Sequence, residues 1–476
     1  MNRLTIVPIA SLMALHFGCS TEEKTEKPNV ILVVIDDQGY ADFGYKGIHQ
    51  NVKTPNLDIF ASESMEFTQG YVSSPICSAT RVGIISGQYQ QRNGNYFYGG
   101  PGISDAPTMA EQFKKLGYST GYIGKLHHGN NDGPDDRGNP NNHGFDHSIT
   151  AFPGGTVHYL YHNYEAVEKH GIWASHWLIN QEIVEQDGFT TEMISDWSQE
   201  YIEESRETPF FLYLSFNAVH NFTFQLPEEY LEEWGLPYYP DYEELDTDET
   251  RREWYARSII PDLPYGREYY LAQLYYFDRE FGKIRQKLKD LGIDDNTMIV
   301  YLSDNGGSNC SGGDNTPLYS TKYSLYEGGI RVPFFIHWPA QIQGGITKNG
   351  MVSSLDIMPT VLAAVGAPED FYQQCDGLNL LPYLKNDIQP ERDILYWDVT
   401  HSWAVRKGEW KLKEVVDQQW ADRVSRRQNT DLGSGLELFN LENDIGEQHN
   451  LADGHPEIVE ELQLLYANWK ELMIQQ

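Results

Sequence analysis

The first long apolar run of the chain predicts a buried strand that ends in two carboxylates. Residues 30–35 read Val-Ile-Leu-Val-Val-Ile, six aliphatic positions without polar alternation. Such a run is typical of a strand covered on both faces, as in a parallel sheet packed between helices. Asp36 and Asp37 follow directly. Since open α/β sheets bind ligands beyond the carboxyl ends of their strands, we expect these two residues at a binding site.

Two further apolar runs are predicted to end in the same way. Residues 297–302 lead into Asp304 and Asn305, and a third run leads to His220. Between the runs, apolar side chains recur every three or four positions, which is typical of amphipathic helices. Strands that alternate with helices predict a doubly wound, mostly parallel α/β sheet.

The character of the sequence changes near residues 385–390. Short alternating segments beyond this point indicate antiparallel strands, and residues 456–473 carry the apolar stripe of a helix. A chain of 476 residues is too long for one small core. We therefore expect a large α/β domain over residues 28–388 and a smaller α+β domain, an antiparallel sheet with a helix, over residues 389–476.

The N-terminus resembles a bacterial lipoprotein signal. A short basic start precedes a mostly apolar stretch that is too short to span a membrane, and Cys19 follows it. This pattern predicts a signal peptide over residues 1–18, a lipid on Cys19 and a flexible tether over residues 19–27. We expect an exported protein that is anchored in the periplasm or at the cell surface, with ordinary secretion as the alternative.

The charge of the chain restricts its partners. It has 69 acidic and 35 basic residues, a formal net charge of −34. Such a charge disfavours nucleic acid and anionic membrane surfaces, so contact with a membrane is expected only through the lipid. An anionic substrate would have to be held by local cations.

Two other cysteines, Cys310 and Cys375, have no evident role in the sequence. An exported location permits a disulfide between them. Their distant positions give that pairing no geometric support, and free buried thiols are the equal alternative.

The residues at the predicted strand ends offer only oxygen ligands. Asp36, Asp37, Asp304 and Asn305 suit a hard divalent cation, calcium first and magnesium second, whereas zinc would favour imidazole or thiolate. A helix cap and a turn are the alternatives for the two pairs. Their common position after buried strands favours the metal site.

A short motif adds a candidate nucleophile. Cys77 starts the sequence Cys-Ser-Ala-Thr-Arg, which ends at Arg81 and opens an apolar run predicted as a helix. A cysteine at a helix N-terminus, four positions before an arginine, lies in an electropositive setting that suits an anion. The alternative is a buried cysteine that acts as a small apolar side chain.

Further basic candidates follow predicted strands or precede a turn. Lys125 and His127 would lie on one side if their strand continues. Lys322 precedes a glycine turn in which Arg331 is expected to pair with Glu327. The alternatives are a solvated lysine and a structural turn.

Six blocks, in order, resemble the formylglycine-dependent sulfatases (type I sulfatases) of the alkaline-phosphatase-like superfamily: PNVILVVIDDQGY, CSATR, GKLHHG, FNAVH, SDNGG and YEGGIRVP. The similarity starts at Pro28 and includes LFNLENDIGEQHNLA in the C-terminal part. Ala79 departs from the usual proline, and Leu126 from a common tryptophan. The resemblance implies an alkaline-phosphatase-like catalytic domain and a C-terminal four-stranded sheet with a helix.

The resemblance also implies a mechanism. A maturation enzyme would oxidise Cys77 to formylglycine (3-oxoalanine), whose hydrate attacks sulfur and contributes an oxygen ligand to the calcium ion. Arg81 would hold the hydrate, and Lys125 and Lys322 would grip the sulfate. His220, with Lys322, would protonate the departing alcohol. His127 would take the proton whose removal expels sulfate.

The expected substrate is a sulfated polysaccharide of the algal kind, such as ulvan or carrageenan fragments, with glycosaminoglycans and aryl sulfates as alternatives. The chain has 31 tyrosines and 11 tryptophans, whose rings can stack on sugars, and residues 234–255 are expected to line a cleft or lid. One rival function is hydrolysis of phosphate or phosphonate esters. Another is glycan binding by a surface lipoprotein that has lost catalysis.

Overall fold

The computed structural model describes residues 27–474, apart from residues 98, 129–135, 152–158, 162–176, 246 and 260–262. The predicted signal peptide and almost all of the predicted tether lie outside this part of the chain. Within it, no helix combines the length and apolar character that a membrane crossing requires.

The centre of the molecule is a ten-stranded sheet in the order β12-β2-β11-β10-β1-β9-β3-β4-β6-β7. β1 (Asn29–Ile35) pairs in parallel with β10 (Thr297–Ser303) on one side and with β9 (Phe210–Ser215) on the other. β3 (Ser119–Gly124) pairs in parallel with β9. The apolar runs of the sequence are therefore neighbouring parallel strands, as predicted.

The outer strands make the sheet mixed. β11 is antiparallel to both β10 and β2, and β6 is antiparallel to β4 and β7. A separate two-stranded sheet joins β5 to β8. The bounds of these strands are β2 (Met65–Tyr71), β4 (His147–Ala151), β5 (Leu160–Tyr161), β6 (Trp177–Ile179), β7 (Glu182–Val184), β8 (Gly188–Phe189), β11 (Phe334–His337) and β12 (Ile346–Ser353).

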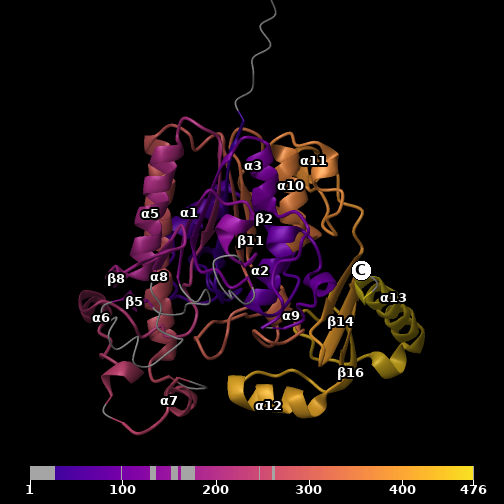
Figure 1. Cartoon of the computed structure of the whole chain (residues 1–476). Coiled ribbons are helices and arrows are strands. Elements are labelled where there is room, and N and C mark those ends of the chain that lie inside the picture. Colours follow the sequence, from indigo (N-terminus) through magenta and orange to yellow (C-terminus); the bar gives the residue numbers. More distant parts are fainter. Residues whose placement is uncertain are drawn as a thin grey trace, which may run out of the picture.

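Helices cover both faces of the sheet, with α5 and α8 on the left and α3 and α10 on the right in Figure 1. Alternate residues of β1 enter two different cores: Ile31, Val33 and Ile35 pack with α1, α5 and α8. Val30, Leu32 and Val34 pack with α2, α3 and α10. Burial on both faces explains why the strand has no polar alternation.

The long helix α8 precedes β10, and two short helices, α6 and α7, lie between β9 and α8. The bounds are α1 (Pro55–Glu63), α2 (Cys77–Ser86), α3 (Met109–Lys115), α5 (Thr190–Ser205), α6 (Glu228–Trp234), α7 (Arg251–Ser258), α8 (Gly266–Asp290), α9 (Glu327–Ile330), α10 (Ile357–Ala364) and α11 (Leu381–Asn386).

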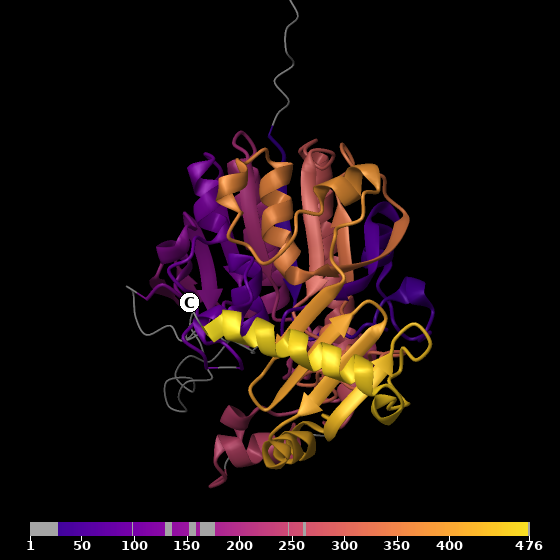
Figure 2. The same cartoon turned by 90° about the vertical axis from the view of Figure 1, so that its right-hand side faces the viewer.

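A four-stranded antiparallel sheet forms the C-terminal part, in the order β13-β14-β15-β16. α13 (Pro456–Ile474) lies across this sheet in Figure 2, as predicted. β13 and the helix α12 were not predicted from the sequence. The bounds are β13 (Ile394–Asp398), β14 (Ser402–Lys407), β15 (Trp410–Val415), α12 (Gln418–Gln428) and β16 (Gly435–Asn440).

Candidate active site

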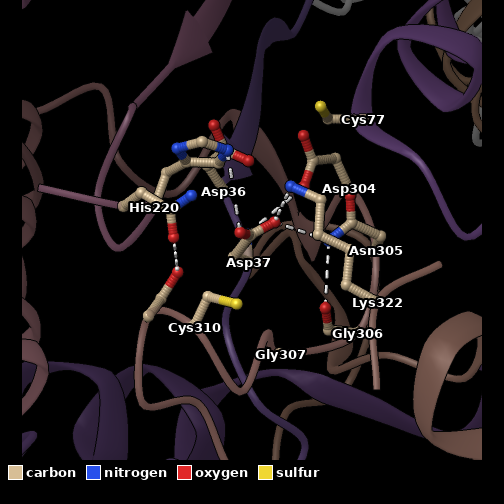
Figure 3. Close-up of polar contacts among 12 residues, drawn as sticks. Asp36, Asp37, Cys77, His220, Asp304, Asn305, Gly306, Gly307, Cys310 and Lys322 are labelled. Atoms are coloured by element: carbon tan, nitrogen blue, oxygen red, sulfur yellow. Dashed lines mark hydrogen bonds and ion pairs between the residues drawn. The ribbon is translucent and has the colours of Figure 1, made fainter. Parts of the chain in front are cut away.

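The ends of β1 and β10 bring two acidic pairs together. Ile35 and Ser303 lie side by side in the parallel register, so the residues that follow them meet. The Asn305 amide donates a hydrogen bond to Asp37 Oδ1 at 2.7 Å, and the Asp37 backbone N–H donates to Asp304 at 3.4 Å (Figure 3). Two pairs separated by more than 260 residues therefore form one group, as predicted.

Close backbone contact fixes this group. Gly306, which follows Asn305, donates its N–H to the Gly329 carbonyl at 3.0 Å. A Cβ atom at Gly306 would lie 1.7 Å from the Gly328 carbonyl oxygen, so only glycine fits there. Asp37 itself has a positive φ of 60°, an unusual conformation for a residue other than glycine.

Cys77 is the first residue of α2, as its motif predicts. Its Sγ lies 3.2 Å from His127 Nδ1. One ligand atom each of Asp36, Cys77 and Asp304 lies within 4.8 Å of the others. The candidate nucleophile therefore stands at the acidic group, at the N-terminus of a helix whose backbone N–H groups favour negative charge.

Each of the three carboxylates has a cation of its own. Lys125 forms an ion pair with Asp36, and Lys322 Nζ lies 2.6 Å from Asp37 Oδ1. Arg81 contacts Asp304 Oδ2 at 2.8 Å. Positive charge is thus concentrated at this site in a protein whose net charge is −34, which supplies the local cations that an anionic substrate requires.

The two candidate histidines reach the site by different routes. His220 follows β9, and its Nε2 lies 3.8 Å from Asp37 Oδ2. β3 ends at Gly124, so strand alternation does not bring Lys125 and His127 to one side as expected. Instead a loop turns them toward the site, with a positive φ of 54° at His127.

Burial and neighbouring charges shift the pKa values of the three carboxylates in opposite directions. Burial alone would raise the pKa of Asp36, but Lys125, His220 and Arg81 hold that pKa well below its usual range. Burial raises the pKa of Asp37 to about 6 against the opposing charge of Lys322. Burial, with the charge of Asp36, likewise raises the pKa of Asp304 to about 6. Burial therefore disfavours the ionised forms of Asp37 and Asp304, whereas the neighbouring cations keep Asp36 ionised.

The basic side chains also have shifted pKa values. Burial lowers the pKa of His220 well below its usual value, and the charge of Lys322 adds to the effect. Burial, together with the charge of Lys125, also lowers the pKa of His127 well below its usual value. Burial opposes the protonated form of Lys322, but the charge of Asp37 outweighs it and raises the lysine pKa. Both histidines are therefore neutral near pH 7, and Lys322 is protonated.

Three buried oxygens of this group have no hydrogen-bond donor among the described residues: Asp36 Oδ1, Asp37 Oδ2 and Asn305 Oδ1. Buried oxygens without a partner are rare in folded proteins, because desolvation is costly. Carboxylate and amide oxygens are the ligands that calcium and magnesium prefer. The residues present therefore fit a hard divalent cation.

Some residues at the site were not found from the sequence. Ser215, at the end of β9, accepts a hydrogen bond from Arg81 at 2.5 Å and donates one to the Lys125 carbonyl at 2.6 Å. Tyr159 donates to the carbonyls of Asn217 and His220. A hydroxyl at the end of an apolar run was the only signal available for Ser215, and Tyr159 gave none.

The two remaining cysteines are free thiols. Cys310 is buried and lies 3.4 Å from the side chain of Gln428, whereas Cys375 is half-buried near the Ser86 carbonyl. Of the two alternatives for this pair, the disulfide is wrong.

Comparison with known proteins gives the family. A family model described as Sulfatase matches residues 28–367, and a second, described as N-sulphoglucosamine sulphohydrolase, C-terminal, matches residues 318–472. The N-acetylgalactosamine-6-sulfatase of Mus musculus is 28% identical over 457 residues, which cover 89% of this chain and 78% of the mouse protein. The N-acetylgalactosamine-6-O-sulfatase of Bacteroides thetaiotaomicron is 26% identical over 547 residues, covering 98% and 99%.

Solved structures agree with this relationship. The structure of Ps i-CgsB in complex with k-i-k-neocarrahexaose has a TM-score of 0.77 and 28% identity, covering 93% of each chain. A phosphonate monoester hydrolase of Agrobacterium radiobacter has a TM-score of 0.61 at 19% identity, which indicates a shared fold alone. Because the first family model covers most of the described chain, the protein belongs to the sulfatase family and is a sulfuric ester hydrolase with an alkaline-phosphatase-like fold.

Proposed function

We propose that this sulfatase removes sulfate from a sulfated polysaccharide or its oligosaccharides, with a formylglycine made from Cys77 and a bound calcium ion. The observation that carries the proposal is the convergence of Cys77, three carboxylates and two lysines, which come from the ends of β1, β10 and β3, the start of α2 and the loop before α9. The relatives named as N-acetylgalactosamine-6-sulfatases and the neighbour solved with a neocarrahexaose support a carbohydrate substrate.

The cation would be held by the oxygens that lack partners, with Asp304 completing the set: Asp36, Asp37, Asp304 and Asn305. Calcium suits such ligands best, and magnesium is the alternative. A divalent ion there supplies positive charge to a sulfate oxygen. It would also favour the ionised forms of Asp37 and Asp304, which burial disfavours.

The side chain at position 77 carries the covalent chemistry. When hydrated, a formylglycine there supplies one hydroxyl as the nucleophile and a second hydroxyl whose deprotonation expels sulfate. His127, 3.2 Å from this side chain and neutral because of its lowered pKa, accepts that proton. Arg81 neutralises Asp304 beside the nucleophile and keeps the carboxylate in place.

The remaining residues bind the sulfate and assist the leaving group. With a cation on the carboxylates, Lys125 and Lys322 would be available to bind the sulfate oxygens. Lys322 stays protonated, and His220 lies on the same carboxylate, Asp37. The departing sugar oxygen takes up a proton that Lys322 supplies and that neutral His220 is placed to relay.

The first experiment compares sulfate with phosphate esters. We expect the mature enzyme to hydrolyse nitrophenyl sulfate and to release sulfate from sulfated oligosaccharides, with slower turnover of nitrophenyl phosphate. Mass spectrometry should find the peptide that contains position 77 lighter by about 18 Da. Preference for the phosphate ester would favour the rival hydrolase, and an unmodified, inactive protein would favour glycan binding alone.

We also propose that the protein works outside the cytoplasm, attached through a lipid on Cys19. The support is the arrangement of basic, apolar and cysteine residues at the N-terminus. Metabolic labelling with a fatty acid should mark the wild-type protein and leave Cys19→Ser unlabelled. Equal labelling of both, or retention of both in the cytoplasm, would contradict this proposal.

A further inference from the structure

The helix α12 is attached to the loops that carry active-site residues. The hydroxyls of Thr321 and Thr430 lie 2.7 Å apart, and Thr321 precedes Lys322. Cys310 contacts Gln428, the last residue of α12. In Figures 1 and 2, α12 lies beside α7, below the large sheet. α12 therefore borders the approach to the active site.

A row of aromatic rings leads from Lys322 to this helix. Lys322 Nζ lies 5.7 Å from the centre of the Tyr323 ring, which is 6.3 Å from the ring of Phe97. Phe97 lies 5.0 Å from Trp420 of α12, and Trp420 stacks on His401 at 3.5 Å. Tyr323, Phe97 and Trp420 are each partly exposed. Exposed rings offer flat apolar surfaces to a sugar ring.

The same helix carries three exposed arginines: Arg423, Arg426 and Arg427. None of their side chains has an ion pair or hydrogen bond with another residue in the described part of the chain. In a protein of net charge −34, three arginines without carboxylate partners are conspicuous, because acidic neighbours are plentiful. They form a local positive surface that is available to an anion.

Helical periodicity separates Arg426 from Arg423 and Arg427, which lie three and seven positions after Trp420. Arg427 and Trp420 therefore lie on one face of α12, whereas Arg426 is turned away by about one third of a turn from Trp420.

Tyr255 of α7 accepts a hydrogen bond from the side-chain amide of Asn221, the residue after His220. Burial raises the pKa of Tyr255, and the charges of Lys322 and Arg427 oppose that rise, so Tyr255 lies near both His220 and Arg427.

We propose that Trp420 and Arg427 of α12, with Tyr255 of α7, form a subsite for a second sugar ring that carries its own anionic group. This inference rests on the proposed function and specifies the substrate further: at least two rings, with a second sulfate or a carboxylate next to the sulfated ring. Trp420 contacts the face of the second ring, and the Arg427 guanidinium binds its anion through paired N–H donors.

The test compares two glutamine variants of the same helix. Arg427→Gln and Arg426→Gln remove the same charge from exposed positions and keep a good helix former. For a disulfated disaccharide we expect Arg427→Gln to lower kcat/KM about 10-fold or more, as for a lost charged hydrogen bond. Arg426→Gln should change it less than about twofold. Neither substitution should change kcat/KM for nitrophenyl sulfate, because that substrate has no sugar ring to occupy the subsite.

A binding experiment separates the two possible anions. Calorimetry on Cys77→Ala protein would compare three disaccharides: monosulfated and otherwise neutral, disulfated, and monosulfated with a uronic acid. We expect one or both of the doubly charged ligands to bind more tightly than the first. That advantage should be lost in Arg427→Gln and kept in Arg426→Gln. The tighter ligand identifies the anion.

Equal effects of the two arginine substitutions would overturn the subsite, as would equal binding of all three disaccharides. If the mature wild-type enzyme released no sulfate from any ester, the proposed function would fail instead. The calorimetric comparison would still test the subsite in that case, because it does not depend on turnover.

Discussion

The protein contains two buried clusters of charged residues. Their residue types are similar, but they differ in how completely their carboxylate oxygens are paired with protein groups. The strand-end cluster comprises Asp36, Asp37, Asn305, Asp304 and the cations paired with them. The interface cluster lies between the two domains. It consists of Glu327, Glu447 and Lys411 with their neighbours Tyr71, Arg331 and Arg406. The Glu327–Arg331 pair, 3.4 Å apart, is the one that the sequence predicted.

In the interface cluster every carboxylate oxygen has a hydrogen bond or a close ion pair, although Glu447 Oε1 has only its ion pair with Lys411 and no hydrogen bond within the described part of the chain. The two oxygens of Glu327 contact Lys411 Nζ at 2.9 Å and the Tyr71 hydroxyl at 2.5 Å. Those of Glu447 contact Lys411 Nζ at 2.9 Å and the Glu327 backbone N–H at 2.6 Å. The strand-end cluster instead leaves three oxygens open. Complete pairing is typical of a structural site, whereas convergent open oxygens indicate a ligand site.

The largest expected effect tests whether the strand-end cluster is the catalytic site. Cys77→Ala should lower sulfate release from nitrophenyl sulfate by more than about 10³-fold, because the variant has no precursor of the nucleophile. Cys310→Ala, at another buried thiol, is the matched control and should retain most activity. Equal retention of activity by both variants would remove Cys77 from the mechanism.

The second effect concerns metal affinity. Asp37→Asn should weaken calcium binding by more than about 100-fold, since it changes a direct ligand rather than an outer partner. Added calcium should raise the melting temperature of the wild-type protein, and this rise should be absent in the variant. Lys411→Met, in the interface cluster, should keep the wild-type response in differential scanning fluorimetry. If calcium raised the melting temperature of both variants by a similar amount, the strand-end cluster would not differ from the interface cluster in calcium binding.

The third effect is on stability. Lys411→Met should lower the free energy of unfolding by about 3–5 kcal/mol, because it leaves two glutamates buried without their shared cation. Urea unfolding followed by circular dichroism would measure the change. Lys407→Met, which removes a partly exposed lysine of the same sheet and its surface ion pair with Glu461, should lower the free energy of unfolding only slightly, because surface ion pairs contribute little to stability. No difference between the variants would mean that the interface cluster contributes little to stability.

The smallest effect is a pH dependence of stability from the interface cluster. Burial, with the charge of Glu327, raises the pKa of Glu447 to about 7 from 4.5, while burial is outweighed at Glu327 by Lys411, which lowers its pKa to about 2. The contribution of Glu447 is therefore complete below pH 4.5 and is lost as the pH rises through 7. That of Glu327 is complete above pH 4.5 and is lost as the pH falls toward 2.

Wild-type stability should accordingly fall by about 1–3 kcal/mol between pH 5 and 8 relative to Glu447→Gln, whose side chain does not titrate. Urea midpoints at several pH values would measure this difference. Parallel pH profiles for the two proteins would show that Glu447 does not titrate in this range.

The strand-end cluster could be predicted from sequence because each of its elements has a local signal. Six apolar residues followed by Asp36-Asp37 indicate both a doubly buried strand and a ligand at its end. The interface cluster could not be predicted from the sequence, apart from the pair of Glu327 and Arg331, which are four residues apart. Glu327, Lys411 and Glu447 meet only after two domains pack, and no local pattern reports a contact between positions 84 and 120 residues apart.

Local signals also failed where tertiary contacts decide the conformation. The helix α12 has only three apolar residues, Trp420, Ala421 and Val424, which pack with a small cluster around Val415 and Leu432. The turn at His127 requires a positive φ that its residue type does not indicate. Both features border the active site, where the fold departs most from local preferences.

Calcium dependence of turnover tests the central claim most directly. The enzyme would be stripped with a chelator, dialysed and assayed for sulfate release before and after calcium is returned. We expect activity to disappear on stripping and to recover with calcium in the wild-type protein, but not in Asp37→Asn. Full activity in the metal-free enzyme would contradict the assignment of these oxygens to a catalytic cation.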